Sequence, residues 1–124
     1  FMEENFMPDN QSIEFDLIVT IVNRGFAEEV VEAAKKAGAE GGTIINGRGS
    51  GIHENAKLFG ISIEPEREIV LTLIDRRKTE KVLEAIYNSV ELNKPSRGMA
   101  FILEVEKAVG ICHLSDSNND CSKK

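Results

Sequence analysis

The 124-residue chain is poor in aromatic residues and in the residue types that build metal sites and disulfides. It has no Trp, one Tyr, two Cys and two His. Cys112 and Cys121 do not form a Cys-x-x-Cys pair, and His53 beside Glu54 supplies too few ligands for a metal cage. We therefore expect two reduced thiols and no metal site. The candidate strands also lack exposed aromatics for base stacking, which argues against an RNA-binding sheet.

Excess positive charge and long hydrophobic segments are missing as well. The net charge is −6, whereas a nucleic-acid-binding protein needs a clustered basic surface. The longest apolar runs have the length of a strand and are too short to span a membrane. No basic segment followed by an apolar one opens the sequence, so we expect no secretory signal. These features predict a cytoplasmic protein with no nucleic-acid partner and no direct membrane insertion.

An internal repeat is the most informative feature of the sequence. A shift of 52 residues places 17–34 on 69–86 without a gap, and several positions are then identical: Thr20 and Thr72, Arg24 and Arg76, Glu28 and Glu80, Val30 and Val82. Each copy consists of an apolar run, a polar turn and a helical pattern. Two such copies, each followed by a further strand, predict an α+β fold of the ferredoxin-like β-α-β-β-α-β type.

Hydrophobic periodicity places the individual elements. We expect a single domain over 13–114, with a flexible lead-in at 1–12 and a disordered tail at 115–124. Gly38 should end the first helix and Thr79 should cap the second. The expected strands lie at 15–22, 42–46, 68–74 and 99–105, the helices at 26–37 and 78–90, and a short turn with a final strand at 106–113.

No convincing catalytic set is present. Cys112 and His113 are neighbours on an expected strand, so their side chains point to opposite faces and cannot act as nucleophile and base. The segment from Gly47 to Gly51 follows a strand, where its backbone N–H groups can form an anion nest. It lacks the Lys of a Walker loop and the spacing of a dinucleotide fingerprint. The alternative interpretation is a flexible hinge.

A long loop from 52 to 65 follows this glycine segment. It combines apolar side chains with polar ones, and apolar side chains on a loop need a partner surface. That surface is either the rest of this chain, a sister subunit or another protein. The residues that we assign to a partner-docking loop are His53, Lys57, Leu58, Phe59, Ile61 and Ile63.

The order of these segments resembles one known family. The run 37–45 with its Gly38 and Gly42, then Arg48-Gly49-Ser50-Gly51 and a long loop, resembles the entry to the T-loop of the nitrogen regulatory PII signal proteins. The turn 93–98 followed by the strand 101–105 resembles their second ligand loop and fourth strand. The similarity covers about 15–111.

This resemblance implies a non-catalytic regulator in nitrogen metabolism. Such proteins are homotrimers that bind adenine nucleotides in clefts between subunits and dock their T-loops on a transporter or an enzyme. The first strand agrees with a trimer, because both of its faces are too apolar for contact with water. The effector-binding residues that follow by position are Gly47, Arg48, Gly49, Ser50, Gly51, Ser96, Arg97 and Gly98.

The chain departs from the family where a triphosphate would be held. Met99, Gly110 and Cys112 stand where family members carry cationic side chains, so we expect ATP to bind weakly or not at all and a smaller, less charged ligand to fit better. Tyr87 lies on the second expected helix, which leaves no tyrosine in the loop to be nucleotidylated. The alternative function is a structural or metal-responsive trimer resembling the divalent-cation tolerance proteins.

Overall fold

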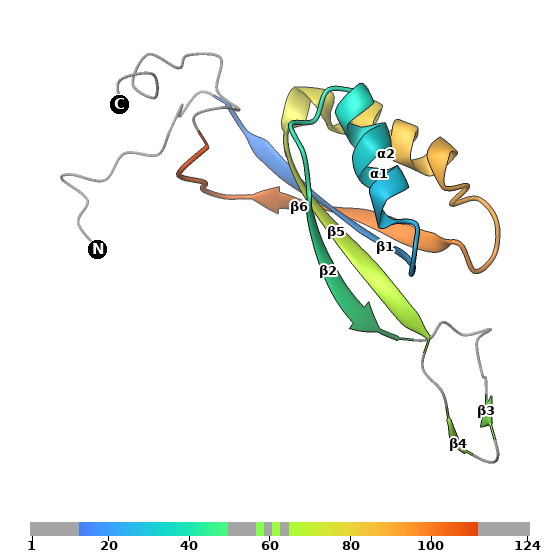
Figure 1. Cartoon of the computed structure of the whole chain (residues 1–124). Helices are drawn as coiled ribbons and strands as arrows, with labels where there is room; N and C mark the ends of the chain where they lie inside the picture. The colour runs from blue at the N-terminus through green and yellow to red at the C-terminus, as the bar shows by residue number, and fades with distance from the viewer. Residues whose placement is uncertain (1–12, 50–56, 59–60, 63–64, 112–124) are drawn as a thin grey trace, which may run out of the picture.

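The protein is described from a computed structural model that covers residues 13–49 and 65–111, together with the backbone of 57–58 and 61–62. A four-stranded antiparallel sheet carries both helices on one face (Figure 1). This is the predicted α+β ferredoxin-like architecture. In chain order the elements are β1 (Phe15–Asn23), α1 (Ala27–Lys36), β2 (Thr43–Arg48), β3 (Lys57–Leu58), β4 (Ile61–Ser62), β5 (Glu66–Asp75), a 3₁₀ turn η1 (Arg76–Lys78), α2 (Thr79–Ser89) and β6 (Gly98–Val105).

The strand order in the sheet is β2-β5-β1-β6, so β2 and β6 form its two edges. The central strand β1 pairs antiparallel with both β5 and β6. Val19 pairs with Leu71, its own equivalent in the internal repeat, 52 residues later in the chain. A pseudo-two-fold axis therefore passes between these two residues. It places equivalent residues of the two halves at opposite ends of the β1–β5 pair.

The hydrophobic core lies between the sheet and the helices. The helices contribute Val30, Ala34, Val82 and Ile86 to the core, and each is no more than 1% exposed. They pack on the side chains of one face of β1 and β5, which are Ile18, Val22, Val70 and Ile74. Thr20 and Thr72 also lie in this layer, and their hydroxyls have no hydrogen-bond partner within the described part of the chain.

The other face of the sheet is apolar and carries no helix. Cross-strand partners on this face are Leu17 with Leu103, Val19 with Phe101, and Ile21 with Met99. The three β6 side chains are 51%, 41% and 57% exposed in the single chain, in that order. Exposed apolar side chains arranged as a continuous sheet face mark a surface that a partner covers.

The first helix ends as the sequence predicts. Gly38 adopts a φ of +123°, and its N–H donates to the Lys35 carbonyl at 3.1 Å. The next amide, of Ala39, reaches back to the Ala34 carbonyl at 2.9 Å. These two hydrogen bonds form a Schellman motif, which requires the left-handed conformation that glycine adopts without strain.

Thr79 does not cap the second helix, so this prediction is wrong. It is the first residue of α2, and Lys78 occupies the cap position without a side-chain hydrogen bond. The Thr79 hydroxyl instead donates to the carboxylate of Asp16 at 2.7 Å. A cap residue has non-helical backbone angles, whereas Thr79 has a φ of −60° and a ψ of −47° and therefore lies inside the helix.

Three further expectations concern the loops and ends. The predicted loop contains a short hairpin, in which β3 and β4 pair antiparallel, so it is not without secondary structure. Over 106–111 no strand forms, while 112–113, the lead-in 1–12 and the tail 115–124 lie outside the described residues. Within the described ranges, no helix has the length and apolar character needed to cross a bilayer.

Candidate functional site

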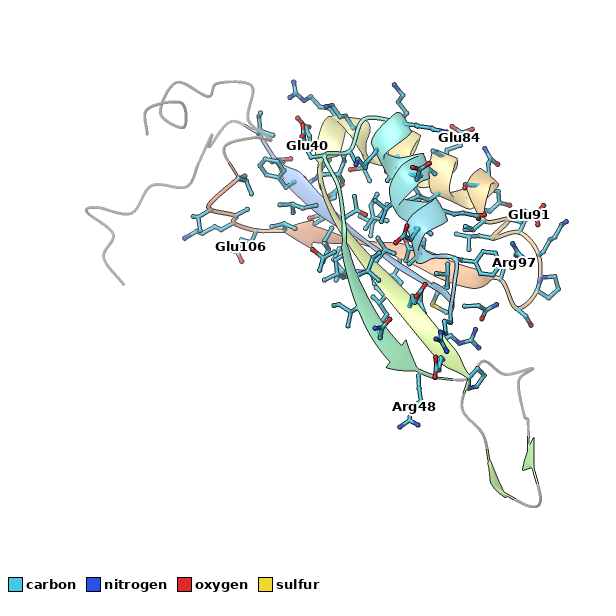
Figure 2. All side chains as sticks on the ribbon, viewed as in Figure 1. Glu40, Arg48, Glu84, Glu91, Arg97 and Glu106 are labelled. Atoms are coloured by element: carbon cyan, nitrogen blue, oxygen red, sulfur yellow. The ribbon has the colours of Figure 1, made fainter. Side chains whose placement is uncertain are left out.

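A surface hollow lies where β2 ends and β5 begins, between the two stems of the segment 50–64. It is lined by Arg24, Asn46, Gly47, Arg48, Glu66 and Arg67. Three of the lining residues are arginines and one is a glutamate, so the net charge of the lining is positive and favours an anion. Figure 2 shows the Arg48 side chain directed away from the sheet at this end.

The rim of the hollow is closed by an exposed ion pair. Arg24 Nη1 lies 2.8 Å from Glu66 Oε1, and the two side chains are 72% and 57% exposed. A pair in such contact with water contributes at most about 1 kcal/mol to stability. The Arg24 amide also donates to the Glu66 carbonyl at 3.3 Å, which ties the turn after β1 to the start of β5.

A chain of hydrogen bonds crosses this end of the sheet. The half-buried Arg67 donates from Nε to the Gly49 carbonyl at 3.2 Å and from Nη1 to Asn23 Oδ1. Asn23 donates from Nδ2 to the Ser96 carbonyl at 2.9 Å. We call the series Gly49–Arg67–Asn23–Ser96 the polar bridge. It joins the end of β2 to the turn before β6.

A long-range carboxylate caps the first helix beside the bridge. Glu68 Oε1 accepts from the Gly25 and Ala27 amides at 3.0 Å each. The N-cap residue Phe26 supplies no side-chain cap, so Glu68 takes over this role. A carboxylate at a helix N-terminus satisfies unpaired N–H groups and complements the helix dipole.

The turn 93–98 is held tightly by its own chain. The Arg97 guanidinium stacks over the Phe26 ring at 4.8 Å, and its Nε donates to the Val90 carbonyl at 3.1 Å. Gly98 has a φ of +139°, and a Cβ placed there would lie 2.2 Å from the Ile21 carbonyl oxygen. Glycine is therefore required at the point where β6 joins β1.

The predicted effector residues fall at opposite edges of the sheet. Gly47, Arg48 and Gly49 lie at the β2 edge, whereas 96–98 lie at the β6 edge. Three strand spacings separate the edges, which is about 14 Å. One chain does not bring both segments around a small ligand; it connects them through the polar bridge. Ser50, Gly51, His53, Phe59 and Ile63 lie outside the described residues, while Lys57, Leu58 and Ile61 belong to the β3–β4 hairpin.

The geometry can be compared with known proteins at this point. The family model "Nitrogen regulatory protein P-II" matches residues 15–113 of the chain. The chain belongs to the P-II family. A search among curated proteins gives no match.

Solved P-II structures have the same fold. The ATP complex of Bacillus subtilis GlnK is 18% identical, with a TM-score of 0.58 and coverage of 74% of this chain and 82% of that one. A second B. subtilis GlnK structure is 16% identical, with a TM-score of 0.57 and coverage of 75% and 86%. Arabidopsis thaliana PII bound to citrate is 20% identical, with a TM-score of 0.59 and coverage of 83% and 85%. Identities this low establish the likeness of fold alone.

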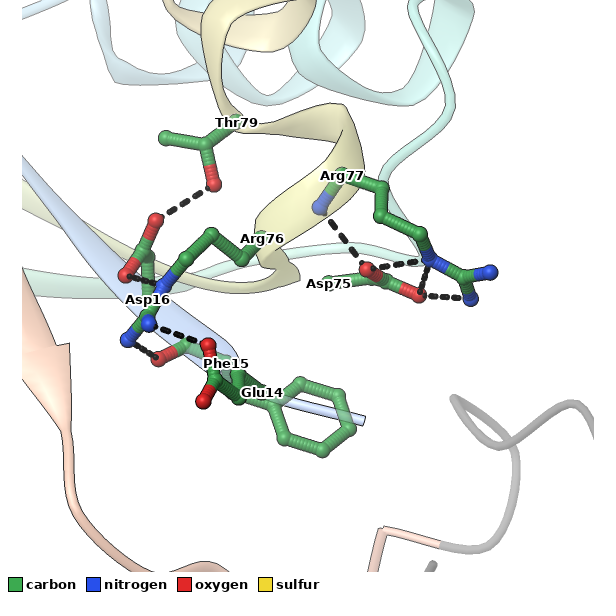
Figure 3. A network of polar contacts seen from close by, with 7 residues as sticks. All are labelled: Glu14, Phe15, Asp16, Asp75, Arg76, Arg77 and Thr79. Carbon is green, nitrogen blue, oxygen red and sulfur yellow. Dashed lines mark hydrogen bonds and ion pairs between the residues drawn. The ribbon is translucent and has the colours of Figure 1, made fainter. Parts of the chain in front are cut away.

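The opposite end of this P-II fold is closed by a satisfied charge network (Figure 3). The buried Asp16 carboxylate accepts from Arg76 Nε at 2.9 Å, and the Arg76 Nη1 reaches Glu14 at 2.6 Å. The hydrogen bond and charge of Asp16 raise the pKa of Arg76. Asp75 accepts from the Arg77 amide and guanidinium, and the Arg77 side chain lowers the pKa of Asp75.

The two ends correspond under the internal repeat. Glu14 and Arg76 are the equivalents of Glu66 and Arg24, and both pairs form an ion pair. The carboxylates of Asp16 and Glu68 are equivalent too, and each accepts two hydrogen bonds at a helix start. The fold therefore uses the same kinds of contact at both ends of the β1–β5 pair.

Sequence reasoning did not assign Asn23, Arg67 or Glu68 to the site. One signal was available, because Glu66-Arg67-Glu68 places three charged residues at the start of an otherwise apolar strand. The partners of Asn23 and Arg67 are distant in sequence, and no motif of fixed spacing relates them. No group of three or more His, Cys, Asp or Glu side chains is placed to hold a metal ion in the described part of the chain.

Proposed function

We propose that this P-II family member is a non-catalytic regulator that assembles as a homotrimer, binds a small anionic effector and controls a partner protein, a transporter or an enzyme of nitrogen metabolism. The observation that carries the proposal is the arginine-lined hollow between the stems of the segment 50–64. A ligand at that position contacts both stems at once. It can therefore bias the arrangement of everything between them.

The open sheet face supports the trimer. Its apolar β1 and β6 side chains need cover, and three sheets packed face-inward provide it. Since the two effector segments lie at opposite edges of one sheet, a neighbouring copy can complete each site. Light scattering at micromolar protein concentration should give the mass of three chains. A monomer would overturn the trimer and the shared site together.

The effector should carry less negative charge than a triphosphate. Met99 is 57% exposed on β6 and offers no charge, and Gly110 likewise offers none. Each missing charge-assisted contact lowers affinity by about 1.5–3 kcal/mol. Calorimetry with Mg-ATP should therefore show weak binding or none, and Met99→Lys should raise the affinity. A micromolar or tighter dissociation constant for the wild-type protein would contradict this assignment.

Arg48 is our candidate for the direct contact with the effector. A thermal-shift panel of ATP, ADP, AMP, cyclic AMP, 2-oxoglutarate, citrate and bicarbonate should identify a stabilising anion. Arg48→Gln should abolish that shift, whereas Lys81→Gln, a matched loss of one exposed cation on α2 and outside both predicted effector segments, should leave it unchanged. Equal losses in both variants would indicate a general charge effect.

The loop 52–65 is our candidate for the partner-docking loop. It carries apolar side chains, and its stems border the hollow. Deletion of 55–61 should leave the trimer intact and abolish binding to the regulated partner. Dissociation of the trimer by this deletion would identify the segment as a structural arm instead.

A further inference from the structure

The polar bridge occupies a central place at the hollow end of the sheet. Arg67 pairs in register with Gly47 on one side and with Asn23 on the other. Its side chain extends the same connection, from the Gly49 carbonyl to Asn23, and Asn23 continues it to the Ser96 carbonyl. The ends of β2, β5 and β1 and the turn before β6 are thus joined by one series of contacts.

The internal repeat shows that the fold does not require this bridge. The equivalent of Arg67 at the other end is Phe15, which is buried at 4% exposure and has no charge. The equivalent of Asn23 is Asp75, which accepts from Arg77 two residues later. An ion pair, and a carboxylate that accepts two hydrogen bonds beside it, occur at both ends, whereas the bridge occurs at the hollow alone among the described residues.

We propose that Asn23 and Arg67 are positioning residues that couple the base of the segment 50–64 to the turn 93–98 within one chain. Arg67 also lines the hollow, so an anion bound there competes with Gly49 and Asn23 for its guanidinium. A change at one segment is then transmitted to the other, and the coupling is reciprocal. Its use in signalling rests on the proposed function, but the coupling itself can be measured without a ligand.

Two backbone amides report on the two segments. The Gly49 amide donates to the Pro65 carbonyl at 3.1 Å, and the Lys94 amide donates to the Glu91 carbonyl at 3.0 Å. Hydrogen exchange of both amides can be followed by NMR on the ligand-free, full-length protein. If each end of the bridge supports the other by one hydrogen bond of about 1 kcal/mol, breaking it accelerates exchange about fivefold.

Arg67→Met removes the guanidinium and keeps an apolar stem, and Asn23→Ala removes the side-chain amide with both its oxygen and its N–H donors. We expect Arg67→Met to accelerate exchange at Lys94, and Asn23→Ala to accelerate exchange at Gly49. Each effect is measured at the far end of the bridge. The proposal is overturned if each variant alters only the segment that its own side chain contacts.

Asn23→Asp separates coupling from a general loss of structure. It keeps an oxygen for Arg67 but loses the N–H donor to Ser96. Exchange at Lys94 should therefore rise, and exchange at Gly49 should rise less than in Asn23→Ala. Arg24→Met, which breaks the neighbouring exposed pair, should change neither amide. Acceleration of both amides by Arg24→Met would refute a specific bridge. Titration of citrate into the wild-type protein tests the effector site separately. If the NMR chemical shifts of the residues that line the hollow do not change, citrate does not bind there. The exchange rates of the variants test the coupling in either case.

Discussion

Gly98→Ala should lower the free energy of unfolding by about 3 kcal/mol, and two separable causes contribute. The φ of +139° is a conformation that L-residues with a side chain adopt at a cost of about 1–2 kcal/mol. The new Cβ would also lie 2.2 Å from the Ile21 carbonyl oxygen, whereas the shortest ordinary carbon–oxygen contacts are about 3.3 Å long. The strands β1 and β6 must therefore move apart by about 1 Å at this end, which weakens their pairing by a further 1–2 kcal/mol or so.

Two other glycines serve as matched controls for these causes. Gly25 has a φ of +100°, but a Cβ there meets nothing within 4 Å, so Gly25→Ala should show the conformational cost alone. Gly49 has no left-handed φ, and a Cβ there also meets nothing within 4 Å. Gly49→Ala should be neutral or stabilise slightly by restricting the unfolded chain.

Urea unfolding followed by far-UV circular dichroism suits this comparison, because the chain has no Trp. All variants must be measured at one protein concentration, since association adds to apparent stability. The expected order of stability is Gly49→Ala, then Gly25→Ala, then Gly98→Ala. A Gly98→Ala variant no less stable than Gly25→Ala would refute the steric argument and the close approach of β6 to β1.

Three further substitutions test other parts of the structure. Thr72→Val should stabilise the protein by about 1 kcal/mol in thermal or urea unfolding, because its buried hydroxyl has no partner within the described residues; a loss of stability would reveal a partner such as a buried water. Glu68→Gln should cost about 1 kcal/mol through the weakened cap of α1, and an unchanged urea midpoint would contradict that role. Asp75→Asn should destabilise most above pH 4. The pKa of Asp75 is lowered from its ordinary 3.8 by Arg77, so its contribution is present above that value and disappears as pH falls through the folded-state pKa. A difference from the wild type that stays constant from pH 6 to pH 3 would show that the ionised carboxylate is not the cause.

The fold was predictable because its elements are long and amphipathic. The helix expected at 26–37 spans Ala27–Lys36, with its end set by the Gly38 conformation. The hairpin of β3 and β4 escaped prediction because strands of two residues are too short for a hydrophobic period. The Thr79 prediction failed because η1 begins the helical turn before it, so Thr79 lies inside the helix. Its hydroxyl donates to Asp16, which is 63 residues away in sequence.

The site was predictable only where it follows a strand end. Gly47 and Arg48, which the glycine segment assigned to the effector, line the hollow, and their role in binding stays a prediction. Asn23 and Ser96 are 73 residues apart in sequence, and no pattern of residue types predicts a contact between them. Arg97 was assigned to the effector by position, and its side chain is stacked on Phe26 in this chain; its role in binding stays a prediction.

The pseudo-two-fold symmetry distinguishes residues that hold the fold from those that serve the site. A pair that recurs at both ends, such as Arg24–Glu66 and Arg76–Glu14, meets a need that both halves share, which is to fasten a turn to the neighbouring strand. Arg67 stands where the other half buries Phe15, and an apolar side chain therefore suffices at that place in the architecture. Because an apolar residue can fill this position, the fold alone does not explain the half-buried guanidinium of Arg67. The explanation must come from its surroundings. Here Arg67 lines the hollow and donates to the carbonyl of Gly49, so the one asymmetric cation of the central strand pair connects the hollow to the end of β2.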